Sequence, residues 1–372
     1  MSPAARSPKK SARVLGEGGL AGPAFLPEHL PQTWDDLLGN EALKGQLEQT
    51  LLEGRASHAY LICGSEGMGK LTLALLLARA LRCTGWGTPP CGACPNCTAY
   101  AARRFHPDVV FVEPGWNERG ERKKTIGVDE IREQVTAALS LRPDGPGKKV
   151  FLIPHGEKLT PQAQNALLKG LEEPPDYAVF LLLTENREAI LPTVCSRMVA
   201  LELSPLPEPL LLAELERRTG KSGAEARHIA AAARGSLGRA LKLAASEEFA
   251  ALSAAVRGWL SRLETADAVE AMQMAEEMKP YQGSPEFLDL FLAWYRDVLA
   301  ALTLPEGRWE AVLLDGARRE EVRRAAAGET IPGVFARIDA VRLAQKRLAA
   351  NANFVLTMEL LLRRLKKQPD AV

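Results

Sequence analysis

Four cysteines occupy one stretch of fifteen residues in the pattern C-x7-C-x2-C-x2-C: Cys83, Cys91, Cys94 and Cys97. Four thiolates at this spacing, with Gly and Pro supplying tight turns between them, can close a tetrahedral site around a metal ion. Such a site has no open position for a substrate, so we expect structural zinc. Iron–sulfur binding is the alternative, which the lack of a redox-partner motif disfavours. Cys63 and Cys195 are scattered in apolar surroundings, so no disulfide framework is indicated.

A second candidate site is the glycine loop GSEGMGK, which lies between an apolar run and a helical pattern. In a P-loop the backbone amides surround phosphate oxygens and the lysine neutralises their charge. The candidate nucleotide-binding residues are Gly64, Gly67, Gly69 and Lys70. The next residue is Leu71, where the pattern requires a hydroxyl that ligates Mg²⁺. Thr72 points about 100° away around the helix and cannot replace it. The site is therefore degenerate, and ATP binding by this chain is doubtful.

The strand predicted at 150–153 bears on the same question. In a working P-loop ATPase this strand ends in acidic residues that hold the metal and polarise water. Here it is followed by Pro154 and His155, and Glu157 lies two or three residues too far along, where we expect a solvated helix start. Two metal-handling positions are thus lost together. The sequence argues against ATP hydrolysis by this chain.

Ser196 and Arg197 form the third candidate site, just before the last predicted strand. An arginine at such a place is most simply a solvated surface charge. In a P-loop protein it can instead reach the γ-phosphate held by a neighbouring subunit, as an arginine finger. We therefore name Arg197, with Ser196 beside it, as catalytic candidates that would act in trans.

Composition excludes several classes of protein. The 372 residues suffice for two or three domains, and the net charge of +1 argues against a surface that binds nucleic acid all over. The basic loop at 115–127 is expected to be a solvated face, with nucleic-acid contact as the alternative. No apolar run reaches the roughly 18 residues of a membrane helix. The N-terminus has no apolar core segment, so it is no secretion signal, and we expect a cytoplasmic protein.

The elements that must position these residues alternate between strands and helices. Strands are predicted at 59–63, 109–112, 150–153, 178–184 and 198–203, with helices at 41–53 before them and at 72–78, 128–139 and 162–172 between them. Continuous apolar strands alternating with helices predict a doubly wound α/β domain with a parallel sheet. The predicted divisions are a disordered tail (1–26), this domain (27–204) with the cysteine module (82–98), and helical regions at 205–246 and 247–367.

Several segments together resemble the AAA+ clamp-loader subunits of bacterial DNA polymerase III. They are RASHAYLICG (55–64), the inserted cysteine module, QNALLKGLEEPP (164–175) and Ser196-Arg197-Met198. The family usually has Cys where this chain has Met198, but the arginine is kept. The resemblance extends over residues 28–366. It implies that 205–246 is a helical lid, 247–367 a collar domain for oligomerisation, and Arg239 a sensor-2 arginine at the nucleotide site.

Within that family the chain resembles the delta-prime branch, which commonly has defective ATPase motifs and keeps the arginine finger. The resemblance implies a non-hydrolysing stator in a hetero-pentamer with gamma/tau motor subunits and a delta subunit. It also implies the sliding clamp and primed DNA, reached through the assembly, as partners, and no membrane. The alternatives are a gamma/tau-like motor that tolerates Leu71 and a stand-alone zinc-dependent DNA-binding protein.

Overall fold

The computed structural model describes residues 26–366, apart from 28, 102–106, 118 and 315–317. The chain divides into two compact units between Ser204 and Pro205. The predicted tail lies outside the described residues except for Leu26, which is buried in the first unit. Across the described ranges, no helix has an apolar stretch of the length that a membrane crossing requires.

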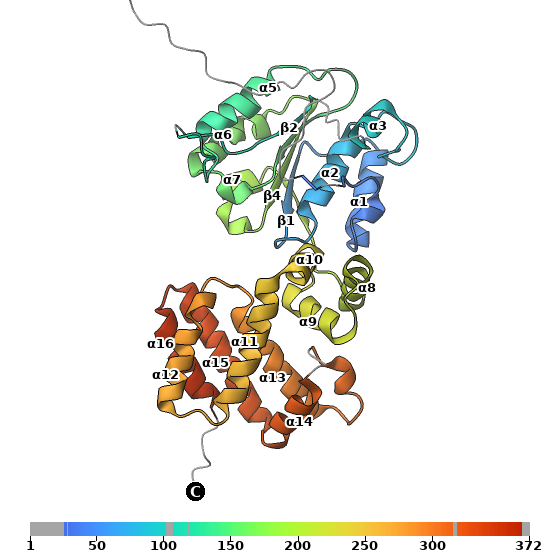
Figure 1. The fold of residues 1–372 in the computed structure, drawn as a ribbon. Coiled ribbons are helices and arrows are strands. Elements are labelled where there is room, and N and C mark those ends of the chain that lie inside the picture. The colour runs from blue at the N-terminus through green and yellow to red at the C-terminus, as the bar shows by residue number, and fades with distance from the viewer. Residues whose placement is uncertain (1–25, 28, 102–106, 118, 315–317, 367–372) are drawn as a thin grey trace, which may run out of the picture. The chain divides into compact units, whose positions relative to one another are not determined.

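A parallel sheet forms the centre of the first unit (Figure 1). Its described strands lie in the order β2-β3-β4-β1-β5, and each neighbouring pair is parallel. Leu61 is opposite Leu182, and Phe151 is opposite Phe180. The predicted parallel sheet is confirmed. The strands are β1 (Ala59–Cys63), β2 (Val109–Phe111), β3 (Lys149–Ile153), β4 (Ala178–Thr184) and β5 (Val199–Glu202).

Helices cover both faces of this sheet, as the continuous apolar strands require. Tyr60 and Ile62 pack with α1 and α2 on one face, whereas Ala59 and Leu61 pack with α4 and α6 on the other. Figure 1 shows α1, α2 and α3 gathered apart from α5, α6 and α7. The α-helices are α1 (Glu41–Leu52), α2 (Lys70–Leu81), α3 (Pro95–Ala101), α4 (Val128–Ile131), α5 (Ala137–Leu139), α6 (Pro161–Glu172) and α7 (Pro192–Cys195).

The helix predicted at 128–139 is not uniform. A π-helical turn (η2, Arg132–Thr136) separates α4 from α5. Ile131 and Val135 are both buried against the sheet, so the apolar spacing that predicted a helix is retained. In a π-helical turn each backbone hydrogen bond connects residues five apart instead of four, a difference that the spacing of apolar residues does not reveal.

The second unit is entirely helical in its described residues. Its apolar side chains form a single cluster that contains Leu215, Leu243, Phe249 and Phe291. Because this cluster draws on both the predicted lid and the predicted collar, their separation at residue 246 stays a prediction. The helices are α8 (Glu208–Thr219), α9 (Gly223–Ala233), α10 (Leu237–Ala245), α11 (Glu247–Leu263), α12 (Ala268–Glu277), α13 (Phe287–Thr303), α14 (Arg319–Ala327), α15 (Ile331–Ala349) and α16 (Phe354–Leu365).

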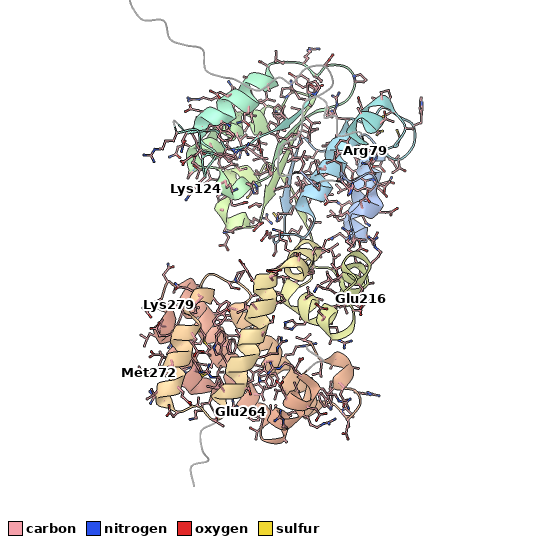
Figure 2. All side chains as sticks on the ribbon, in the orientation of Figure 1. Arg79, Lys124, Glu216, Glu264, Met272 and Lys279 are labelled. Carbon is pink, nitrogen blue, oxygen red and sulfur yellow. The ribbon has the colours of Figure 1, made fainter. Side chains whose placement is uncertain are left out.

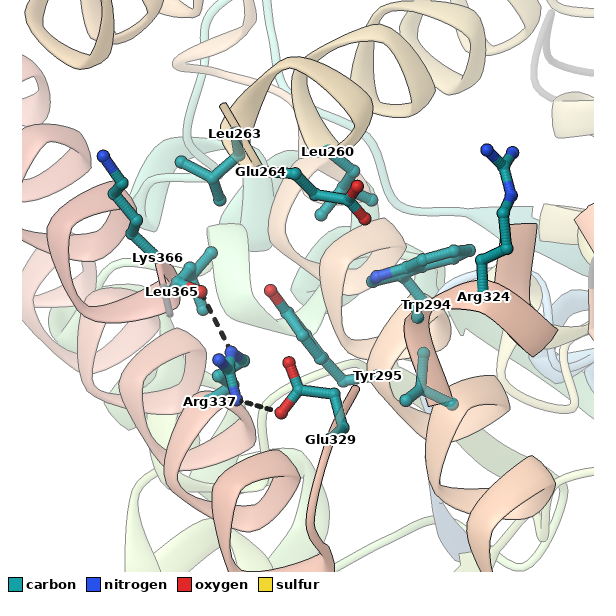
Figure 3. Close-up of a pocket in the computed structure, with 12 residues that line it drawn as sticks. Leu260, Leu263, Glu264, Trp294, Tyr295, Arg324, Glu329, Arg337, Leu365 and Lys366 are labelled. Carbon is teal, nitrogen blue, oxygen red and sulfur yellow. Dashed lines mark hydrogen bonds and ion pairs between the residues drawn. The ribbon is translucent and has the colours of Figure 1, made fainter. Parts of the chain in front are cut away.

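A cavity of about 260 Å³ lies within this helical unit (Figure 3). Trp294 and Tyr295 line it, and burial raises the pKa of Tyr295. Beside them the guanidinium of Arg337 forms an ion pair with Glu329 at 2.7 Å, and Arg337 Nε donates to the carbonyl of Leu365 at 2.9 Å. This buried charge pair therefore ties α15 to the end of α16 and to the segment before α15.

Candidate functional site

The glycine loop lies at the carboxyl end of β1 and leads directly into α2. Gly67 (φ +74°) and Gly69 (φ +94°) have left-handed backbones, and Gly69 is the N-cap of α2. A Cβ at position 69 would lie 2.9 Å from the side chain of Leu37. The left-handed loop conformation therefore requires glycine, and a side chain at position 69 would also displace Leu37; this confirms the strand–loop–helix arrangement of a P-loop.

Lys70 is bound within its own loop. Its ammonium group donates to the carbonyls of Gly64 at 2.7 Å and Ser65 at 2.9 Å, and it lies 3.5 Å from the carboxylate of Glu185. Burial lowers the pKa of Lys70, an effect that Glu185 opposes. The lysine that would neutralise a phosphate thus already has acceptors for its three protons.

Leu71 replaces the magnesium-binding hydroxyl of a P-loop with an apolar group that packs into the core. Its half-buried side chain contacts the hydrophobic cluster on the α1–α2 face of the sheet. An isobutyl group offers no lone pair to a cation. This position therefore contributes to stability in place of metal binding.

The carboxyl end of β3 presents His155 and Glu157 near the lysine. His155 Nδ1 lies 3.4 Å from Glu157 Oε1. Burial alone would raise the pKa of Glu157, but hydrogen bonds from His155 and the Glu185 amide hold it below its usual value. Glu157 also acts electrostatically on Lys70. Glu157 is exposed and lies in the 3-10 turn η3 (Gly156–Lys158), which agrees with a solvated helix start, and His155 is its added partner.

Arg197 lies on the turn between α7 and β5. Its Nη1 donates to the carbonyl of Thr193 at 2.8 Å and to Ser196 Oγ at 3.3 Å, while Nη2 forms an ion pair with Glu172 at 2.7 Å. The Arg197 side chain is 36% exposed. Ser196 Oγ itself donates to Thr193. The predicted finger residues are therefore adjacent and accessible, and Glu172, at the end of α6, is a partner that the sequence reasoning missed.

Arg239, the predicted sensor-2 residue, belongs to the helical unit. Its backbone amide is capped by Ser236 Oγ at the start of α10. Its guanidinium forms an ion pair with Glu286 at 2.9 Å. A role for Arg239 at the nucleotide site stays a prediction.

The four clustered cysteines converge in space as their spacing predicts. Their sulfur atoms all lie within 4.8 Å of one another. Tetrahedral zinc–thiolate bonds of about 2.3 Å need sulfurs about 3.8 Å apart, so small side-chain rotations would close a site. The amides of Cys91 and Cys94 donate to the sulfurs of Cys83 and Cys91, each at 3.3 Å. Such bonds stabilise thiolates, and the cluster could hold a metal such as zinc.

The cysteine module is fitted closely to the first unit. Gly85 has no room for a side chain, because a Cβ there would lie 2.3 Å from the sulfur of Cys91. Arg79, on α2 and labelled in Figure 2, donates to the carbonyl of Cys97 at 3.1 Å, and Trp34 Nε1 donates to the carbonyl of Pro89 at 2.9 Å. The buried Arg79 had no signal of its own in the sequence, since it lies within an apolar helix.

The parallel sheet and its glycine loop define a P-loop protein of the AAA+ class. The family described as "DNA polymerase III, delta subunit" matches residues 39–207. The delta-prime subunit of DNA polymerase III from Bacillus subtilis (strain 168) is 30% identical over 317 residues, which cover 84% of this chain and 92% of that protein. The tau subunit from Escherichia coli (strain K12) is 32% identical over 295 residues, covering 77% of this chain but 42% of tau.

The chain therefore belongs to the family of AAA+ clamp-loader subunits of DNA polymerase III. A crystal structure of a gamma-subunit-related protein from Thermotoga maritima aligns with 86% of this chain and 98% of that one. The sequence identity is 19% and the TM-score is 0.38, a level at which the likeness supports no further conclusion.

Proposed function

We propose that this chain is the non-hydrolysing delta-prime, or stator, subunit of a clamp loader. In this proposal it occupies a hetero-pentamer with gamma/tau motor subunits and a delta subunit, and the assembly loads a sliding clamp at primed DNA. Arg197 is supplied to the ATP site of the neighbouring motor subunit. A finger of this kind contributes about 10³–10⁵ in rate, or roughly 4–7 kcal/mol of barrier.

The observation that carries the proposal is the apolar packing of Leu71 together with Pro154 and His155, instead of carboxylates, directly after β3. A chain that lacks both metal-handling groups has no means of holding Mg-ATP for hydrolysis, while Arg197 remains accessible. The extent of the match to a delta-prime subunit supports the same reading. Structural zinc at the cysteine cluster is part of the proposal.

A gamma/tau-like motor is the second candidate, and two observations favour it. Tau and gamma subunits are also similar to this chain. Glu157, in the turn after β3, acts electrostatically on Lys70, so one carboxylate lies close enough to influence the P-loop lysine.

Mg-ATP turnover by the purified chain separates the two candidates. The stator proposal expects no turnover above background from the chain alone, and expects the chain to increase turnover when it is added to motor and delta subunits. If Mg-ATP turnover persists at the same specific activity after the chain is purified again, the chain is a motor subunit and not a stator. A chain that leaves the activity of the motor subunits unchanged would overturn the stator proposal.

A further inference from the structure

Two of the six tryptophans are exposed, in contrasting surroundings. Trp34, Trp259, Trp294 and Trp309 are buried, whereas Trp116 is 65% exposed and Trp86 is fully exposed. Trp86 lies in the cysteine module, whose residues 83–97 include no Asp, Glu, Lys or Arg. Trp116 lies in the 115–127 loop, which has four cationic and two acidic residues. A large aromatic side chain left in water is a candidate contact surface, and the charges around it indicate for what.

The loop that presents Trp116 is folded as a small hairpin between β2 and α4. Trp116 pairs with Arg122 in an isolated antiparallel bridge, and Asn117 N donates to the carbonyl of Glu121 at 2.8 Å. The side chain of Asn117 closes the tip, because its Oδ1 accepts from the amides of Arg119 and Glu121. The described residues of the hairpin are therefore held by their own hydrogen bonds, which lowers the ordering cost of binding a ligand.

Two of the four cations of the loop are engaged in holding it. Arg122 makes paired hydrogen bonds to Glu113 at 2.7 and 2.8 Å, and its Cζ lies 5.5 Å from the centroid of the Trp116 ring. Lys123 forms an ion pair with the buried Glu130 at 2.7 Å. These contacts fix the hairpin to Glu113, just after β2, and to Glu130 on α4, and they balance the charges of Arg122 and Lys123.

The other two cations are available to a ligand. Arg119 and Lys124 are exposed, and within the described part of the chain neither forms an ion pair with an acid; Figure 2 labels Lys124. They lie on either side of the Trp116–Arg122 bridge in the hairpin. An indole that is 65% exposed, with Arg122 over one part of its ring and two cations in the same hairpin that have no described ion pair, suits a single-stranded nucleic acid, since bases stack and phosphates need positive charge.

We propose that Trp116 stacks on an unpaired nucleobase of a single-stranded nucleic acid, while Arg119 and Lys124 bind the adjoining phosphates. The proposed stator role reaches DNA through the assembly, so a direct contact by this chain goes beyond it. A protein partner would fit the uncharged surroundings of Trp86 better than those of Trp116. The hairpin is one small contact, in keeping with the net charge of +1, and binding is expected to be weak.

The test uses the full chain with every tryptophan replaced by 5-fluorotryptophan and observed by ¹⁹F NMR. Trp116→Phe and Trp86→Phe assign the two exposed signals by their disappearance. Titration with (dT)₁₀ is expected to shift the Trp116 signal and leave the Trp86 signal in place. An abasic decamer, with the same phosphates and no bases, should not reproduce the shift. An unmoved Trp116 signal, an equal shift at Trp86, or an equal effect of the abasic decamer would each overturn the proposal.

Affinity measurements on variants give a second readout. Trp116→Ala should weaken (dT)₁₀ binding by about 5- to 150-fold, whereas Trp116→Phe should retain most of it. Arg119→Ser with Lys124→Ser should lower the slope of log K against log[salt] by about 1.4, that is about 0.7 for each phosphate. Trp86→Ala and Arg187→Ala serve as controls that leave binding unchanged. Equal binding by wild type and Trp116→Ala would contradict the proposal, and neither result depends on ring assembly.

Discussion

The guanidinium of Arg197 and the carboxylate of Glu172 form an ion pair, with Nη2 2.7 Å from Oε1. The two side chains are 36% and 49% exposed, so the pair adds little to the stability of the chain. Its importance is geometric, because a carboxylate and a phosphate present similar oxygens to a guanidinium. The structure thus holds Arg197 against an anion at an accessible edge of the first unit.

Replacing Arg197 is expected to lower the ATPase rate of the reconstituted complex without disturbing its assembly. Arg197→Ala should reduce hydrolysis at the site that it serves by about 10³ or more, because transition-state charge loses its partner. Arg187→Ala is a matched control, since Arg187 is also exposed and ion-paired, to Glu202 at 3.0 Å. Single-turnover rates of complexes with each variant make the measurement. Equal rates for the two variants would remove the finger from the proposal.

Restoring the missing hydroxyl should not restore hydrolysis. Leu71→Thr supplies a magnesium ligand but leaves Pro154 and His155 where carboxylates are needed, so the chain alone should still show no Mg-ATP turnover. The substitution removes apolar contact from the α1–α2 face, and the free energy of unfolding should fall by about 1 kcal/mol. Turnover and urea denaturation are measured on the same preparation. Clear turnover would show that Leu71 is the single defect.

The purified chain should contain one zinc ion, removable by chelation. Cys94→Ser should abolish metal retention in elemental analysis, because three thiolates leave a tetrahedral site incomplete. Cys63→Ser and Cys195→Ser are matched controls and should keep the metal, since neither belongs to the cluster. Metal loss should also weaken the contact between Trp34 and Pro89, visible as a change in tryptophan fluorescence. A native chain without any metal would refute the zinc assignment.

The buried pair in the helical unit should be costly to break. Glu329→Gln leaves the guanidinium of Arg337 without a counter-charge, with the two side chains 11% and 10% exposed. We expect the free energy of unfolding to fall by about 3–5 kcal/mol. Glu320 is ion-paired with Arg323 but its side chain is 72% exposed, so Glu320→Gln should change the free energy of unfolding by less than about 0.5 kcal/mol. Similar losses in the two variants would mean that burial does not decide the effect.

Glu214 should contribute an acid-sensitive part of the stability. Hydrogen bonds from Arg217 and Arg218 lower the pKa of Glu214 to about 2 from the ordinary 4.5. Because the folded pKa is the lower one, the contribution is fully present above about pH 4.5 and is lost as the pH falls toward 2. Glu214→Gln should be less stable than wild type at neutral pH, and the two stability curves should converge near pH 2. Parallel curves would contradict this assignment.

The first unit was largely predictable because its strands are buried on both faces. Runs such as 59–63 and 178–184 are continuously apolar, and the structure has strands over the same residues. The π-helical turn at Arg132–Thr136 was not predictable, since the apolar spacing there is that of an ordinary helix. Helix α3 was not predicted either. It begins at Pro95, inside the cysteine cluster, where the spacing of the residues was interpreted as that of metal ligands and not as that of a helix.

The candidate site was predictable where chemistry follows spacing along the chain. The cysteine pattern and the glycine loop are local, and both sets of residues come together as expected. The partners Glu172, Glu185 and Glu157 were not predictable, because each lies far along the chain from the arginine or lysine on which it acts: at the end of α6, just after β4 and in η3. Pairing between distant elements needs three-dimensional register, which one sequence does not supply.

The bonds that Lys70 makes inside its own loop change how a familiar mutation must be interpreted. The ammonium group of Lys70 donates to the carbonyls of Gly64 and Ser65, and these two hydrogen bonds stabilise the turn without a phosphate. Lys70→Ala would therefore release the turn as well as remove a charge. In this chain, a loss of activity in Lys70→Ala would also follow from the altered loop conformation, so that loss alone would be no evidence of nucleotide binding.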